Sequence, residues 1–111
     1  MSSIHEKLVE LLSDELASFI DGEPQYLYDG IQAKLKSGAN LQIIYPTPDE
    51  YVFKWEQDGE TFKVDTAPLH KELPTFPNHF HSGDVVEADT ITNIKNSPEE
   101  NLKKVIAFIG G

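Results

Sequence analysis

The sequence predicts an α+β domain in which an N-terminal and a C-terminal helix pack on an antiparallel β-meander of about four to five strands. Two observations lead to this prediction. Apolar residues recur at helical spacing near both ends of the chain, and between those ends the hydrophobic period changes from 3.6 to 2. A length of 111 residues suits one core, so we expect residues 1–111 to form a single domain.

The first helix is predicted to begin at Ser3, because Ser3 and Glu6 form the Ser-x-x-Glu pattern of a capping box. Apolar residues then follow a helical period for about five turns, until Asp21-Gly22 ends the pattern. His5 lies in the first turn and is expected to be a surface residue without a partner. The apolar stripe consists of Ile4, Leu8, Leu11, Leu12, Leu16, Phe19 and Ile20.

A second helix is predicted from Pro98. Ser97 is a suitable N-cap, proline is favoured at the first helical position, and Glu100 stands three residues after the cap. Gly110-Gly111 closes the chain. The apolar stripe of this helix consists of Leu102, Val105, Ile106 and Ile109.

Alternating patterns predict the strands between the helices, at residues 31–35, 41–45 and 51–55. Asp58-Gly59 predicts a two-residue hairpin turn. Closing that turn pairs Trp55 with Phe62 on one face. The same register sets Lys54 opposite a second lysine on the other face, which must therefore be exposed to water.

Charge restricts the possible partners. The chain has 19 acidic residues against nine lysines and no arginine, a formal net charge of −10. Such a chain repels phosphate backbones at long range, and it has no guanidinium to grip phosphate, so a nonspecific nucleic-acid groove is disfavoured. The acids could simply maintain solubility. If they contact a partner, we expect a basic contact face on that partner.

The chain contains no cysteine, which excludes a disulfide scaffold and a thiolate zinc site and fits a reducing compartment. The N-terminus has no basic region followed by an apolar run. No apolar run approaches the roughly 18 residues that a membrane span needs. We therefore expect a cytoplasmic protein with no membrane association.

Residues 66–84 hold three of the four histidines, His70, His79 and His81. Three prolines in the same segment prevent regular ladder pairing, so most of it is expected to be an ordered loop. A short strand near its end would place His79 and His81 on one face and Phe80 in the core. His70 would have to lie nearby to complete a single site.

Several interpretations of this segment remain open. Two histidines could act as acid and base, with Lys71 stabilising an oxyanion and Asp65 orienting one ring; RNA cleavage suits this set because the 2′-hydroxyl supplies the nucleophile. The same pair could hold Zn²⁺ or a similar ion, with His70, Asp65, Glu72 or Asp84 as third ligand. The segment could also bind another protein. Composition alone favours a structural role, in which the rings bond unpaired loop backbone.

The run "KWEQDGETFKVDTAPLHKELPTFPNHFHSGDVV" resembles the signature of the TumE family, small toxin-side proteins of bacterial and archaeal toxin–antitoxin pairs. The resemblance covers about residues 51–86. Leu69 and Asn78 stand where the family has a second histidine, and Lys63 is the nearest cation where the family commonly has arginine. The matching positions are Asp65, Pro68, His70, Thr75, Phe76, Pro77, His79 and His81.

The resemblance implies a toxin paired with a helix-turn-helix antitoxin and, by analogy with many such toxins, an action on RNA. We therefore expect a cofactor-free TumE-like protein that uses its histidine segment on RNA. The alternatives are a non-enzymatic module that pairs with a regulator and a small histidine/carboxylate metal-binding domain. An enzyme needs at least two of the histidines exposed in one cleft. The expected catalytic residues are His79 and His81 as acid and base, His70 as third member, and Asp65 and Lys71 in support.

Overall fold

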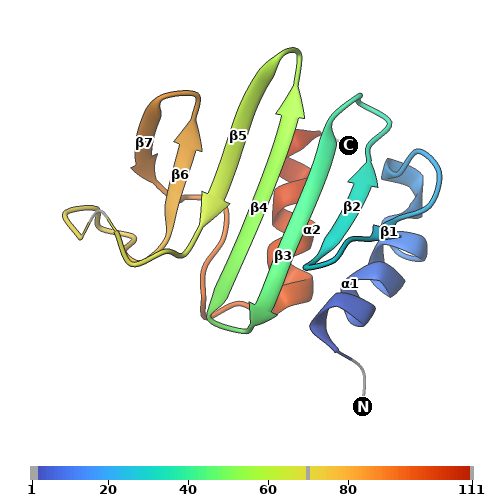
Figure 1. The fold of residues 1–111 in the computed structure, drawn as a ribbon, viewed down its shortest axis with the longest axis horizontal. Coiled ribbons are helices and arrows are strands. Elements are labelled where there is room, and N and C mark those ends of the chain that lie inside the picture. Colours follow the sequence, from blue (N-terminus) through green and yellow to red (C-terminus); the bar gives the residue numbers. More distant parts are fainter. Residues whose placement is uncertain (1–2, 70, 111) are drawn as a thin grey trace.

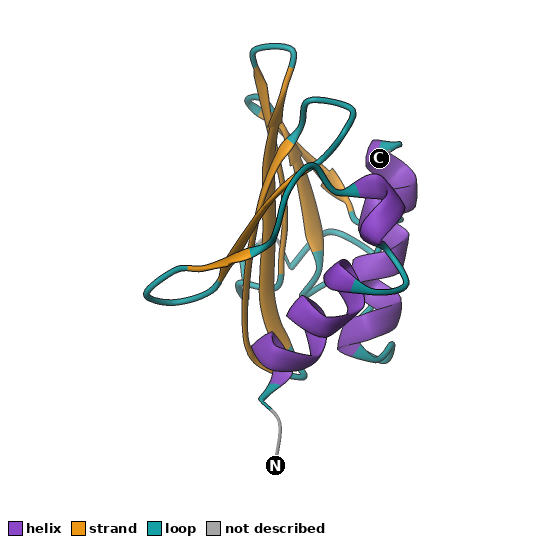
Figure 2. Ribbon diagram, turned by 90° about the vertical axis from the view of Figure 1, so that its right-hand side faces the viewer, coloured by secondary structure: helices purple, strands orange, loops and turns teal. Residues whose placement is uncertain are grey.

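The computed structural model describes residues 3–69 and 71–110, and within them two helices lie on one side of a seven-stranded antiparallel sheet (Figures 1 and 2). The strands are neighbours in chain order, so the sheet is a continuous meander. The α+β class and the antiparallel meander are as predicted. The strands are β1 Gln25–Tyr26, β2 Ile31–Lys34, β3 Asn40–Thr47, β4 Glu50–Gln57, β5 Glu60–Asp65, β6 His79–Ser82 and β7 Val85–Ala88.

The prediction of four to five strands was too low, because it missed the two edges of the sheet. β1 is two residues long and both are exposed, so it has no alternation that a pattern could reveal. β7 has adjacent valines at its start and is held by the turn at Gly83, which has a φ of 59°. Short edge strands carry too few residues to show a period.

The first helix is shorter than predicted. α1 spans Ile4–Ser13, and the Ser3 capping box is present in full. The chain then passes through a 3₁₀ turn at Ala17–Phe19, and Ile20 forms an isolated bridge with Leu35 beside β2. Pairing with the sheet therefore ends the helical path before Asp21-Gly22, although Ile20 remains buried as its apolar character requires.

The second helix agrees with its prediction. α2 spans Pro98–Ile109, with the Ser97 hydroxyl accepting the Glu100 N–H at 3.1 Å and Gly110 ending the helix at a φ of 89°. The four residues of its predicted apolar stripe are buried in the core, whereas Phe108 is 54% exposed. Neither described helix is long and apolar enough to cross a membrane.

The Asp58-Gly59 hairpin has the predicted geometry. Both turn residues have positive φ, 54° and 80°, and the register pairs Trp55 with Phe62. Their ring centroids are 5.6 Å apart, and Trp55 is only 1% exposed. The same register sets Lys54 opposite Lys63 on the other face, as expected.

The two faces of the sheet differ completely. We call the face under the helices the covered face and the opposite one the open face (Figure 2). On the open face, side chains from neighbouring strands form rows of mostly polar, partly exposed residues. The covered face carries the core residues of the central strands, Ile31, Ala33, Leu41, Ile43, Phe53, Trp55, Val64 and Phe80.

His5 has a partner, contrary to the sequence prediction. The Tyr45 N–H donates to His5 Nε2 at 2.9 Å, where the β3–β4 pairing is irregular between Ile44 and Thr47. The ring thus satisfies a backbone donor at a break in the ladder. This histidine ties α1 to β3 and takes no part in the site described below.

Candidate functional site

The candidate site lies on the open face, where β5 pairs with β6. The register sets Asp65 opposite His79 and Lys63 opposite His81. Because side chains alternate along a strand, both histidines share this face, while Phe80 between them points into the core and is 9% exposed. These four residues, Lys63, Asp65, His79 and His81, are called the Asp65 cluster below.

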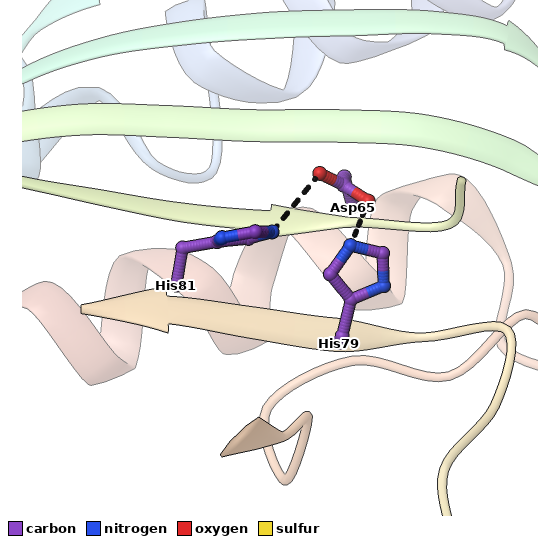
Figure 3. A group of neighbouring side chains, drawn as sticks. All are labelled: Asp65, His79 and His81. Carbon is purple, nitrogen blue, oxygen red and sulfur yellow. Dashed lines mark ion pairs between the residues drawn. The ribbon is translucent and has the colours of Figure 1, made fainter. Parts of the chain in front are cut away.

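Three cationic or ionisable groups converge on the Asp65 carboxylate. His79 Nε2 lies 2.6 Å from Oδ1, whereas Lys63 Nζ and His81 Nε2 lie 3.2 Å and 3.5 Å from Oδ2. Figure 3 shows the carboxylate reached by both rings, whose centroids are 4.8 Å apart. The Ala67 N–H also donates to Oδ1, at 3.1 Å. Asp65 therefore holds the position of every other member.

Both ring nitrogens of His79 have a partner. Nδ1 lies 3.1 Å from the Pro77 carbonyl oxygen, which can only accept a hydrogen bond. Nε2 lies 2.6 Å from Asp65 Oδ1. The ring is therefore held from both sides, by the loop backbone and by the Asp65 carboxyl group.

Burial divides the Asp65 cluster into an inner and an outer half. The side chains of His79 and Asp65 are 1% and 7% exposed. Those of His81 and Lys63 are 24% and 38% exposed. A ligand approaching the open face therefore meets His81 and Lys63 first, with the inner pair behind them.

A groove of about 640 Å³ opens beside Asp65. Its lining includes Ile44 and Val52, which are partly exposed on the open face. Glu50 and Asp65 are the two acidic residues that line it. The remaining apolar walls are Pro46, Ala67, Pro68 and Pro77.

The other predicted site residues lie elsewhere or outside the described residues. His70 is outside them. Lys71 is exposed in the loop, and among the described residues the ion pairs of Asp65 are those with Lys63, His79 and His81. Glu72 and Asp84 are exposed too. Over residues 3–69 and 71–110, the group that could hold a metal ion is Asp65, His79 and His81, with ligand atoms within 4.8 Å of one another.

Sequence reasoning did not predict the polar contacts that hold the strand before His79. Asn78 Nδ2 donates to the Tyr51 hydroxyl at 2.7 Å and to Asp89 Oδ2 at 3.0 Å. Asp89 also accepts the Thr92 hydroxyl, and all four residues are buried. Burial raises the pKa of Tyr51 to about 12, against the lowering effect of hydrogen bonds from Thr92 and Asn78. The only signal in the sequence is the Asp89-x-x-Thr92 spacing, typical of a local turn.

Lys63 was also missed as a site residue. It was noted only as the cation nearest the aspartate, whereas the β5–β6 register places it directly beside His81. That register depends on a pairing across the loop that follows Asp65, which no local pattern encodes. The alternating pattern of β5 nevertheless puts Lys63 and Asp65 on one face.

The fold and site define a class of protein: a small α+β domain with a compact ionisable cluster on the open face of its sheet. The family model described as Toxin TumE matches residues 5–111, and the chain therefore belongs to the TumE toxin family. No curated protein and no solved structure matches the chain. Family membership implies a toxin-type protein whose partner is an antitoxin protein.

Proposed function

We propose that this chain is a toxin that cleaves RNA at the Asp65 cluster. The gathering of basic groups is the observation that carries the proposal. Lys63, His79 and His81 all reach the one Asp65 carboxylate, on a chain whose net charge is −10. A phosphodiester is attracted to such a spot and repelled by the rest of the surface.

The exposed half of the cluster supplies the acid and the base. His81 takes the proton of a 2′-hydroxyl on Nδ1, because its Nε2 is buried on the side of Asp65. The 2′-oxygen attacks phosphorus to form a 2′,3′-cyclic phosphate. The bond from phosphorus to the 5′-oxygen breaks, and Lys63 gives that oxygen a proton. Both residues then recover their protonation state from water. Lys63 replaces His79 as acid because the His79 side chain is 1% exposed.

His79 and Asp65 are positioning residues in this proposal. The His79 ring holds one oxygen of the Asp65 carboxylate, and the other oxygen faces Lys63 and His81. This arrangement keeps the two exposed groups side by side. Preorganised charges of this kind need no rearrangement when charge develops on the phosphate.

The antitoxin is proposed to be a helix-turn-helix protein with a basic contact face, and the pair is proposed to act in the cytoplasm. The excess of acidic residues supports the charge assignment. Complementary charge accelerates encounter and is screened by salt. We expect the association rate with the cognate antitoxin to fall as ionic strength rises, and a salt-independent rate in stopped-flow measurements would contradict a basic contact face.

The deciding experiment incubates the purified protein with cellular RNA, with and without a chelator. The expected products carry 2′,3′-cyclic phosphate and 5′-hydroxyl ends, and a 2′-deoxy residue at the cleavage position blocks the reaction. Lys63→Gln should slow cleavage, whereas Lys36→Gln, an equal charge change at an exposed position beyond β2, should not. Intact RNA together with tight antitoxin binding would instead select a non-enzymatic interaction module.

A metal site is the second candidate, and a specific geometry favours it. Asp65, His79 and His81 present ligand atoms within 4.8 Å of one another. The bond from His79 Nδ1 to Pro77 resembles the outer contacts that orient metal-binding imidazoles. Lys63 opposes this candidate, because its ammonium lies 3.2 Å from the same carboxylate. Zn²⁺ binding by calorimetry and chelator-sensitive cleavage would select the metal site.

A further inference from the structure

We infer that the open face holds one nucleotide of single-stranded RNA across two neighbouring rows of side chains, with its phosphate on a lysine row and its base in the groove beside Asp65. This inference rests on RNA being the substrate and adds where the strand lies. It assigns a role to Lys54, Ile44 and Val52, which the proposed chemistry leaves unused.

The lysine row crosses four strands. Gln42 of β3 pairs with Lys54 of β4, Lys54 with Lys63 of β5, and Lys63 with His81 of β6. Side chains that are directly opposite lie about 5 Å apart at their Cβ atoms, so the row is continuous. It contains two lysines and no acidic residue. A phosphate backbone lying along this row is therefore led to His81.

The groove row runs beside it. Ile44 of β3 pairs with Val52 of β4, Val52 with Asp65 of β5, and Asp65 with His79 of β6. The first two residues form the apolar floor of the groove, and the last two form the inner half of the Asp65 cluster. The groove and the reactive groups are therefore continuous through Asp65.

The spacing of the rows suits a nucleotide. They are two residues apart along each strand, which is about 6.8 Å in an antiparallel sheet. A ribose bridges a comparable distance between its base and its phosphate. The lysine row and the apolar half of the groove row thus match the two ends of one nucleotide.

The charges of the groove determine whether the base or the phosphate of the nucleotide lies in it. Its lining includes Glu50 and Asp65 but no lysine or histidine, so a phosphate or an acidic side chain finds no positive charge there, whereas a neutral base needs none. The apolar floor favours burial of a base face. An acidic peptide from a partner fits the lysine row but not the groove beside it, and RNA is therefore the occupant that fits both rows.

The test of the lysine row measures binding of a short 2′-O-methyl RNA, which cannot form a cyclic phosphate, by fluorescence anisotropy over a range of salt. Lys54→Gln should weaken binding severalfold and reduce the slope of log affinity against log salt by about 0.7, the value for one phosphate of a single strand. Lys104→Gln on α2 is the matched control and should bind as the parent protein does. Equal slopes for Lys54→Gln and the parent would overturn the phosphate assignment.

The test of the groove compares an intact oligonucleotide with one that lacks a base at a single position. Val52→Asp should reduce the affinity for the intact oligonucleotide roughly tenfold or more. Val52→Thr keeps the shape of the side chain and protects the fold, and it should reduce this affinity about fivefold. When the nucleotide that lacks its base is the one placed at the groove, Val52→Thr and the parent protein should bind this oligonucleotide with equal affinity. An equal loss for both oligonucleotides would overturn the base assignment.

Failure of this inference is distinguishable from failure of the proposed function. If the parent protein cleaves RNA while the Lys54 and Val52 variants bind and cleave normally, the strand lies elsewhere and the chemistry stands. If the parent protein does not bind the oligonucleotide, the inference fails whatever the cleavage assay gives. Loss of antitoxin binding in the same variants, with RNA binding unchanged, would make the open face a protein interface.

Discussion

The covered face and the open face of the sheet are built from the same strands, but the covered face forms the core and the open face holds the candidate site. Neighbours in sequence separate completely: Val64 and Phe80 enter the core, while Asp65 and His79 enter the charged cluster. Period-2 geometry alone causes this separation. One short alternating sequence can therefore define a core and position a site.

Polar groups are satisfied differently on the two sides. Asn78 precedes His79 in the sequence, and its side chain lies on the opposite face. It is held by hydrogen bonds to Tyr51 and Asp89, and Thr92 completes this network, in which Asp89 is the acidic residue. His79 is held by an ion pair at 2.6 Å. A neutral hydrogen bond contributes about 1 kcal/mol, and one to a charged group roughly twice as much. The open face thus concentrates the stronger interactions, those made to a carboxylate.

The largest expected effect distinguishes the faces directly. Trp55→Ala should destabilise the domain by roughly 3–5 kcal/mol, because Trp55 is 1% exposed and packs on Phe62. Lys54→Ala, the adjacent residue on the open face, should change stability by less than about 0.5 kcal/mol. Denaturant unfolding of both variants measures the difference. A cost below about 1 kcal/mol for Trp55→Ala would show that the pair is not core.

The second effect concerns the buried half of the cluster. If His79 and His81 served catalysis alone, removing either would leave stability nearly intact. Burial of His79 changes that expectation, because His79→Ala deletes the short bond to the Asp65 carboxyl group and leaves a cavity. The cost should be roughly 2–3 kcal/mol, the upper range for hydrogen bonds to charged groups. Thermal unfolding within a degree of the parent protein would show that the pair contributes nothing.

The faces also differ in how far the sequence could predict them. The hairpin register follows from Asp58-Gly59, and both ends of α2 follow from Ser97 and Gly110, because the turn and the caps are local chemistry. The shared face of His79 and His81 likewise follows from spacing. The burial of one and not the other depends on surroundings supplied by distant segments, so spacing could not distinguish them.

Long-range pairing accounts for the remaining differences. The contact of Lys63 with Asp65 and the neighbouring groove require the β5–β6 and β3–β4 registers together. The early end of α1 requires the bridge between Ile20 and Leu35. In each case the pairing residue is too far away in the sequence for a local hydrophobic pattern to reveal it. Leu16 and Ile20 are buried in the observed structure, as they would also have been in a longer helix.

The third effect is a pH dependence of stability that arises from Tyr51, on the covered face. The pKa of Tyr51 is about 12 in the folded protein and 10.0 for the unperturbed group, so the unfolded chain loses this proton first as pH rises. The contribution of Tyr51 to the free energy of unfolding is fully present below about pH 10. It falls by about 2–3 kcal/mol between pH 10 and 12. Urea unfolding at several pH values measures it. Tyr51→Phe should lack this component, and a parent protein whose stability does not fall in this window would contradict the assignment.

The smallest effect on stability should accompany a large effect on activity. The His81 side chain is 24% exposed, and its Nε2 lies 3.5 Å from Asp65, beyond a strong hydrogen bond. His81→Ala should therefore cost less than about 0.5 kcal/mol in unfolding free energy. The same change should slow RNA cleavage roughly 10²- to 10⁴-fold, the range for a lost general base. Single-turnover cleavage and denaturant unfolding of one preparation give both quantities. Full activity in a stable His81→Ala protein would remove the proposed base, whereas unfolding of this variant would make His81 a structural tie and leave the open face without its accessible histidine.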